Sequence, residues 1–279
     1  MRINNNIMAL NAHRNLGVNT SKQTKSLEKL SSGLRINRAA DDAAGLSISE
    51  KMRSQIRGLK QASKNAQDGI SFLQTAEGAM DEVSSMLVRL KELAVQKATG
   101  TYDADDKKSV KLEANELLTQ IKDIVVNTDF NGKNIKDKID VVVTDDDQST
   151  VEIGLADGVV EMDGANLKAD STNKLNVLLK KIATDGTGGD VTTAEVEAAI
   201  THINTVRSTF GAQQNRLEST VNNLNTTVQN LTDSESRIRD TDMAEEMASY
   251  TKNNILVQAA TAMLAQANQA PQSVLSLLQ

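Results

Sequence analysis

Few side chains in this sequence could carry out chemistry, and they lie far apart. The two histidines, His13 and His202, stand in opposite halves of the chain, and neither belongs to the H-E-x-x-H pattern of a zinc peptidase. The chain has no cysteine, which excludes disulfides and thiolate chemistry. It also lacks a phosphate-binding loop, a dinucleotide-binding fingerprint and a G-x-S-x-G turn. The sequence therefore predicts a protein that is not an enzyme and uses no cofactor.

One acidic run, Asp145–Asp147, could suggest a calcium site. An EF-hand loop would need a glycine at its sixth position and a glutamate at its twelfth, and this run has neither. We interpret it as a solvated turn between two strands, and we expect no metal site.

The composition favours helices that pack along narrow seams. The chain has 39% hydrophobic residues but only 2% aromatic ones, with no tryptophan and a single proline. The net charge of −6 is spread over interspersed signs, so nucleic acid is not an expected partner. No apolar run is long enough to span a membrane, and membrane insertion is not expected. The N-terminus lacks the apolar run of a cleaved signal peptide, which favours a cytoplasmic protein or export by a route without one.

The segment 70–96 is the element around which the chain is organised. Its apolar residues recur in alternating steps of three and four, the seam of a coiled coil: Leu73, Ala76, Met80, Val83, Leu87, Leu90 and Ala94. The C-terminal half carries a matching seam: Phe210, Gln214, Leu217, Val221, Leu224, Val228, Leu231, Glu235 and Ile238. Because the apolar side chains of one seam can be buried only against another helix, we expect these two helices to pair.

The chain between the two seams should form an excursion. A third helix is predicted from a cap at Asp103 to about Asn127. An Asn-Gly turn at 131–132 precedes two predicted strands, 139–143 and 150–155. A short helix at about 175–182 is expected next.

The return helix should begin at a capping box formed by Thr192 and Glu195. The predicted fold is mainly α: a long antiparallel helical hairpin or coiled-coil bundle with a small β-hairpin region. We expect a discontinuous domain of residues 1–44 and 237–279, and a helical-bundle domain of residues 45–236 with its β excursion at about 128–190.

Both ends of the chain are weakly amphipathic helices, and Pro271 should bend or fray the second one. Each end has apolar positions with no partner in the chain except the other end: Ile3, Ile7, Leu10, Leu27, Leu30 and Leu34, and Ile255, Leu256, Leu264, Val274, Leu275, Leu277 and Leu278. We expect these tails to be disordered alone and to order on assembly.

An exposed patch on the 70–96 helix has two interpretations. Its members are Arg89, Glu92, Leu93 and Gln96, with Glu113 on the neighbouring helix. The spacing alone favours surface charge around a core leucine. An arginine one turn from an apolar residue can also be a binding hot spot.

Five segments closely resemble the bacterial flagellins, the subunits of the flagellar filament. They are LSSGLRINRAADDAAGLSIS at Leu30–Ser49, Asn65–Ser71, Gln74–Met80, Glu235–Asp240 and Ala265–Pro271. The resemblance covers roughly the first 130 and the last 90 residues. It implies a structural, secreted protein that polymerises with itself, with the tails as an inner tube, without large outer domains.

The resemblance also implies partners. They are the flagellar export chaperone and the hook-associated and cap proteins, with export of the unfolded chain through the flagellar secretion channel. As a host partner it implies Toll-like receptor 5, through Leu87, Arg89, Glu92, Leu93, Gln96 and Glu113. Val88 stands where the family usually has Gln, and Lys91 where it has Arg, which loses the guanidinium fork.

Two other members of the flagellar group are alternatives. A hook–filament junction protein resembles flagellin at both ends but forms a short layer, and the match at 30–49 and 235–240 favours flagellin over it. Some flagellin relatives carry a peptidase in the middle of the chain. The short excursion here and the absence of H-E-x-x-H argue against that class.

Overall fold

The computed structural model describes residues 6–135, 139–144, 150–153, 162–163, 166–167 and 191–277, of which 162–163, 166–167 and 270–277 by their backbone alone. The described part is dominated by long helices: α1 (Ile7–Ser32), α2 (Ala43–Ala98), α3 (Ala104–Asn127), α5 (Thr193–Arg239) and α6 (Met243–Leu277). The prediction of a mainly α fold with a small β-hairpin region is confirmed. The acidic turn at 145–147 and the helix expected at 175–182 lie outside the described residues.

The chain forms two compact units. The first consists of Met1–Ile56 and Gln229–Gln279, and the second of Arg57–Val228. Helices α2 and α5 contribute residues to both. The domain boundaries expected from the sequence, 44/45 and 236/237, remain a prediction.

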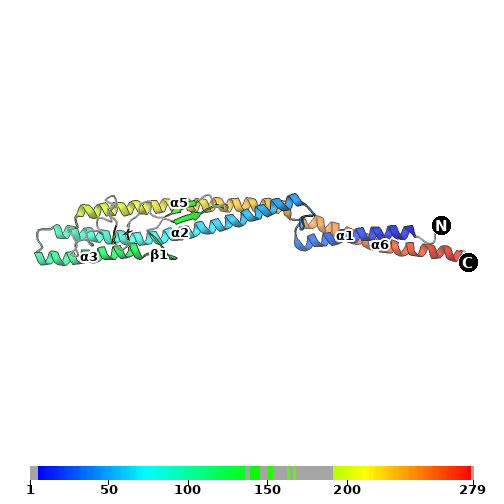
Figure 1. Cartoon of the computed structure of the whole chain (residues 1–279), viewed down its shortest axis with the longest axis horizontal. Helices are drawn as coiled ribbons and strands as arrows, with labels where there is room; N and C mark the ends of the chain where they lie inside the picture. Colours follow the sequence, from blue (N-terminus) through cyan, green and yellow to red (C-terminus); the bar gives the residue numbers. More distant parts are fainter. Residues whose placement is uncertain are drawn as a thin grey trace. The chain divides into compact units, whose positions relative to one another are not determined.

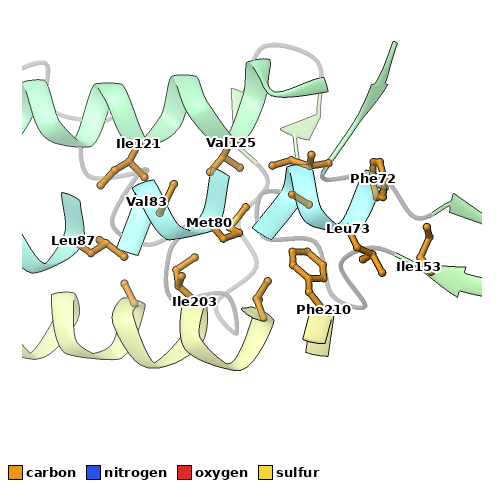
Figure 2. Close-up of a cluster of buried hydrophobic side chains, with 14 of the residues drawn as sticks. Phe72, Leu73, Met80, Val83, Leu87, Ile121, Val125, Ile153, Ile203 and Phe210 are labelled. Carbon is orange, nitrogen blue, oxygen red and sulfur yellow. The ribbon is translucent and has the colours of Figure 1, made fainter. Parts of the chain in front are cut away.

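The second unit is built around α2. Figure 2 shows Met80, Val83 and Leu87 of α2 lying between two other helices, with Ile121 of α3 on one side and Ile203 of α5 on the other. Figure 1 likewise shows α2 between α3 and α5. These side chains belong to one contiguous buried cluster. Because α2 is covered on two sides, it contributes two adjacent apolar faces rather than a single seam.

Ion pairs across α2 and α5 fix their register. Lys91 Nζ lies 2.7 Å from Glu197 Oε1, and Arg207 Nη1 lies 3.0 Å from Asp81 Oδ1. A ten-residue step back along α2 is thus matched by a ten-residue step forward along α5. At this register the 73–94 seam faces the beginning of α5, up to about residue 215. This corrects the expected pairing of the whole seam with residues 210–238, most of which lie farther along.

The β region consists of two-stranded antiparallel hairpins. β1 (Asp129–Phe130) pairs with β2 (Lys133–Asn134), and β3 (Ile139–Val142) pairs with β4 (Thr150–Ile153). The first turn is Asn131-Gly132, with φ of 52° and 76°, as the Asn-Gly signal predicts. A third pair that the sequence did not reveal joins β5 (Met162–Asp163) to β6 (Asn166–Leu167).

The hairpins are attached to α2 by apolar contacts. The ring of Phe130 in β1 meets that of Phe72 edge to face, with centroids 6.2 Å apart. The side chains of β4 alternate between exposed and buried, which places Val151 and Ile153 in the core. This alternation is why the 150–155 segment could be recognised as a strand.

In the first unit, α1 and α6 lie side by side and antiparallel (Figure 1). Lys29 Nζ lies 3.7 Å from Glu246 Oε2, and Asn6 Nδ2 donates to the carbonyl oxygen of Ala267 at 2.6 Å. The less exposed positions of α1 recur in steps of three and four and are mostly small or polar: Ala9, Ala12, Leu16, Asn19, Gln23, Ser26 and Leu30. The contact between the two helices is therefore short of large apolar side chains.

Helix α6 continues through Pro271 to Leu277, so the fraying expected at this proline does not occur. Proline at position 271 removes the backbone donor that would bond the carbonyl of Ala267 four residues earlier. The side chain of Asn6 supplies the missing donor. The expected fraying was inferred from the residues next to the proline alone. The donor that replaces the missing backbone N–H comes from the other end of the chain.

The two chain connections in the first unit are joined by a clasp, which comprises Gly33–Arg35 and Arg239–Thr241. Leu34 and Asp240 form an isolated antiparallel bridge. The amide of Arg35 donates to the carbonyl of Arg239 at 2.7 Å, and that of Thr241 to the carbonyl of Gly33 at 3.0 Å. Gly33 closes α1 with a φ of 71°, a value that suits glycine. The clasp therefore ties the end of α1 to the start of α6.

Candidate interaction surfaces

The described residues do not bring the reactive side chains together. His13 is exposed on α1 in the first unit, and His202 is half-buried on α5 in the second. Within the described ranges, no group of three or more His, Asp or Glu side chains is arranged to hold a metal ion. A search of the same residues finds no helix with the length and apolar character needed to cross a membrane.

The seam residues predicted on α2 lie in the interior. Leu73, Met80, Val83, Leu87 and Leu90 are at most 1% exposed. On α5, Leu217 is fully buried and Leu224 nearly so, while three others are half-buried: Val221, Val228 and Leu231. These side chains hold helices together and are not a surface for a partner.

Three charged residues of the predicted receptor patch form one connected network. The Arg89 guanidinium donates from Nε and Nη2 to Oε1 of Glu113 on α3, at 3.1 and 2.9 Å. From Nη1 it donates to Oε2 of Glu92, one turn along α2, at 2.9 Å. The bonds to Glu113, then that to Glu92, raise the pKa of Arg89 above its ordinary value. The network thus places a fixed cation between two carboxylates, at a partly exposed position.

The other predicted patch residues are less available. Leu87 and Leu93 are buried, Leu93 in the contact between α2 and α3. Gln96 is half-buried, and its Nε2 donates to the hydroxyl of Tyr102 at 2.9 Å. Exposed apolar side chains lie beside the network instead, at Val88 and Leu112. The exposed part of the patch is therefore Arg89, Glu92 and Glu113.

Large apolar side chains are exposed mainly on α1 and α6. Ten of the fourteen found among the described residues belong to these two helices: Ile7, Met8, Leu10, Val18, Leu27, Met243, Met247, Ile255, Leu256 and Met263. Leu10, for example, is 71% exposed. A soluble helical pair normally buries such residues against its partner and exposes polar ones. In this pair most of the large apolar side chains face solvent instead.

The predicted tail residues divide between exposed and half-buried positions. Exposed are Ile7, Leu10, Leu27, Ile255 and Leu256, while Leu30, Leu34 and Leu264 are half-buried. Val274, Leu275 and Leu277 belong to the helical backbone of α6, and Ile3 and Leu278 lie outside the described residues. The sequence pattern also placed Met243, Met247 and Met263 among the apolar positions of the second tail, and these are exposed, whereas Met8 and Val18 of α1 were missed. Their spacing relative to the small and polar stripe of α1 could have located them.

Comparisons with known proteins match both ends of the chain. Residues 3–140 match the family model described as the bacterial flagellin N-terminal helical region. Residues 193–278 match the one described as the bacterial flagellin C-terminal helical region. The two matches together contain all five long helices.

Relatives cover the whole chain. A flagellin of Bacillus subtilis (strain 168) and a flagellin of Halalkalibacterium halodurans are each 49% identical, over 100% of this chain and 100% of the relative. A crystal structure of Bacillus cereus flagellin aligns with a TM-score of 0.45 at 30% identity, over 58% of this chain and 88% of that one.

Proposed function

The chain belongs to the bacterial flagellin family, and we propose that it polymerises through α1 and α6 into the extracellular flagellar filament. In this role it is a structural protein. Membership of the family also favours this role over that of a hook–filament junction protein.

The proposal rests on one observation: most of the large apolar side chains described on α1 and α6 are exposed to solvent rather than covered by the other helix. Ten large apolar residues meet solvent there. Each fully buried side chain of this kind contributes about 1.5–3 kcal/mol. Other copies of the chain are the occupant that fits, because every copy presents the same two helices and relatives share them over their full length.

The two discontinuous ends form the inner layer of the filament in this proposal. Residues 1–44 and 237–279 make the inner tube, and residues 45–236 the surrounding helical bundle. The free ends are not fully ordered until neighbouring copies cover their apolar faces, because a contact that is mostly of small and polar residues, with few large apolar ones such as Leu16 and Leu30, stabilises a helical pair only weakly. The clasp then marks where the inner layer begins.

The same surface accounts for the partners that we propose during export. A chain with exposed apolar helices would associate prematurely, so an export chaperone must cover them, and the chain travels unfolded through the secretion channel. At the growing end, the hook-associated and cap proteins would meet the same faces of α1 and α6. The absence of cysteine means that no disulfide has to form after export.

Electron microscopy of the purified chain under polymerising salt tests the main proposal. The full chain should form long filaments. A version without residues 1–40 and 240–279 should remain a helical monomer, because it lacks both tails but keeps the buried cluster of the second unit. The double variant Leu10→Gln/Ile255→Gln should raise the polymer's critical concentration, whereas Lys25→Gln/Lys252→Gln on the same helices should not. A full chain that gives only monomers or short rings would contradict the proposal.

We also propose that the chain is a ligand of Toll-like receptor 5 through the Arg89 network. Arginine is one of the residues enriched in binding hot spots. Here the guanidinium of Arg89 is held in place by hydrogen bonds to Glu92 and Glu113. Exposed Val88 and Leu112 supply apolar contact area beside the charges. Leu87 and Leu93 are buried and would contribute indirectly, by holding in place the helix that carries Arg89.

A further inference from the structure

Four of the exposed apolar side chains on α1 and α6 are methionines. Met8, Met243, Met247 and Met263 are 68%, 48%, 50% and 62% exposed. In contrast, Met80 is fully buried in the second unit, and Met52 and Met86 are half-buried. Among the methionines whose side chains the structure describes, the thioethers most accessible to solvent therefore lie on the two helices that carry the assembly surface.

We propose that Met8, Met243, Met247 and Met263 are oxidation sites for peroxides in the free subunit, and that their oxidation to the sulfoxide prevents assembly. This inference rests on the proposed function. Each site takes one hydroperoxide molecule, with hydrogen peroxide as the simplest member of that class.

The step is a transfer of one oxygen atom. A lone pair on methionine Sδ attacks the outer oxygen of the peroxide, the O–O bond breaks, and a sulfur–oxygen bond forms. The sulfur is oxidised by two electrons, and hydrogen peroxide is reduced to water. No further reductant or oxidant is needed for this step. Methionine sulfoxide reductases convert the sulfoxide back to methionine.

Oxidation changes the assembly surface from apolar to polar at several places. Met8 lies in the first turn of α1. Met243 and Met247 lie in the first two turns of α6, and Met263 lies farther along the same helix. A sulfoxide oxygen that is buried without a hydrogen-bond donor is penalised, so each oxidised methionine opposes burial against a neighbouring copy. Since the contacts repeat in every copy, the effect on the polymer is cumulative.

Assembly should in turn protect these residues. A filament that covers the faces of α1 and α6 removes the four thioethers from solvent, and oxidation of a covered methionine is slow. Sensitivity to peroxide is thus confined to the free subunit, before it is incorporated into the filament. The flexible, polarisable methionine side chain also suits a surface that must adapt to neighbours in slightly different positions.

The experiment exposes the full chain to hydrogen peroxide, once as monomer and once as filament. Peptide mass spectrometry measures the gain of one oxygen atom at each methionine, and the critical concentration is then measured. In the monomer, the four methionines should react at least ~10-fold faster than Met80. In the filament, this difference should largely disappear. The oxidised monomer should show a critical concentration raised by ~10-fold or more.

Two variants identify the responsible residues. The quadruple variant Met8→Leu/Met243→Leu/Met247→Leu/Met263→Leu should assemble equally well with and without peroxide. The matched variant Met52→Leu/Met86→Leu should remain as sensitive as the unmodified chain. If the quadruple variant fails to assemble even untreated, methionine sulfoxide reductase provides the second measurement, because it should restore assembly of the oxidised chain.

The outcomes are distinct. Unchanged assembly of a chain with all four sulfoxides would overturn the inference and leave the proposed function standing. So would a quadruple variant that peroxide still inhibits, or oxidised chain that the reductase repairs without recovery of assembly. An untreated chain that forms no filaments would overturn the proposed function, and this inference with it.

Discussion

The side-chain amide of Asn6 bonds the carbonyl oxygen of Ala267, the oxygen that Pro271 leaves without its helical donor. The Nδ2–O distance is 2.6 Å. The other amide atom, Oδ1, accepts the backbone N–H of Ala9 at 3.1 Å and so caps α1. One side chain thus starts one tail helix and repairs the other.

Replacing Asn6 by Asp should separate these two roles. Aspartate keeps the acceptor for the cap of α1 but loses the donor to Ala267, so the loss should be about 0.5–1.5 kcal/mol, seen as a lower melting temperature of the polymer. In the background of Pro271→Ala, which restores the backbone donor, the same substitution should cost measurably less. Equal effects in both backgrounds would show that the Asn6 donor and Pro271 are not coupled.

Acid should weaken the contact between Glu50 and Arg239 in the first unit. Arg239 Nη1 donates to Glu50 Oε1 at 2.6 Å, and chiefly this bond lowers the pKa of Glu50. A lowered pKa stabilises the fold above the unfolded-state pKa, and the contribution is lost as pH falls through the folded value. Thermal unfolding of Glu50→Gln should therefore differ from that of the unmodified chain at pH 7, and the difference should shrink below about pH 4.3. Glu82→Gln, an exposed carboxyl on the same helix, serves as the control. A difference that persists undiminished into acid would argue against this contact as the source.

Neighbouring residues of α2 should differ sharply in their effect on stability. Leu87 is fully buried and Val88 is half-exposed. Leu87→Ala should lower the free energy of unfolding by about 2–5 kcal/mol through lost burial and a cavity. Val88→Ala should change it by about 0.5 kcal/mol or less. Urea denaturation followed by circular dichroism measures both, and similar values would mean that the α2 core is wrongly assigned.

Two glycines of α2 should respond in opposite ways to alanine. A Cβ at Gly78 meets nothing within 4 Å, whereas one at Gly69 lies 3.1 Å from Val141, 3.3 Å from Ile153 and 3.4 Å from Leu217. Gly78→Ala should stabilise the helix by about 0.5–1 kcal/mol. At Gly69 the crowding from three elements offsets that gain, since overpacking costs about 1–3 kcal/mol. Denaturation midpoints should rank Gly78→Ala above Gly69→Ala. The reverse order would show that the side chains of the β3–β4 hairpin shift to admit the new methyl group at little cost.

Receptor binding should depend on both partners of the charged network. Arg89→Ala should weaken binding to Toll-like receptor 5 by more than about 1 kcal/mol. Glu113→Ala should also weaken it, because Arg89 then loses the carboxylate that positions two of its donors. Glu116→Ala, on the same exposed stretch of α3, is the matched control. Surface plasmon resonance with correctly folded variants measures all three, and unchanged binding by both test variants would discard the site.

The residues of α2 show what the sequence could predict. Steps of three and four from Leu73 to Leu90 predict a helix with a buried side, and those side chains are buried. The same repeat continues along α5, however, so periodicity alone cannot say which of its turns face Leu73. That choice depends on specific contacts such as Arg207 with Asp81, which no local pattern reveals.

The tails illustrate a second limit. The sequence predicted apolar positions such as Leu10 with no partner except the other tail, but it did not say which positions that tail covers. In the structure, the side of α1 that meets α6 includes Ala12, Asn19 and Ser26, and Leu10 is exposed. Both stripes have the same helical spacing, and only the presence of α6 shows which is covered. The function of the large side chains therefore follows from the structure of the pair, while the receptor contact remains a prediction.

The matched steps of α2 and α5 limit how the length of this chain can change during evolution. One inserted residue in either helix would rotate everything beyond it by about 100° and shift it by about 1.5 Å. Arg207 would then point away from Asp81, and the buried side of α2 would turn toward water. Deletions are penalised equally. Insertions are therefore tolerated between β4 and α5, where neither helix has to keep step with the other, and new surface features can be added there without disturbing the contact between α2 and α5.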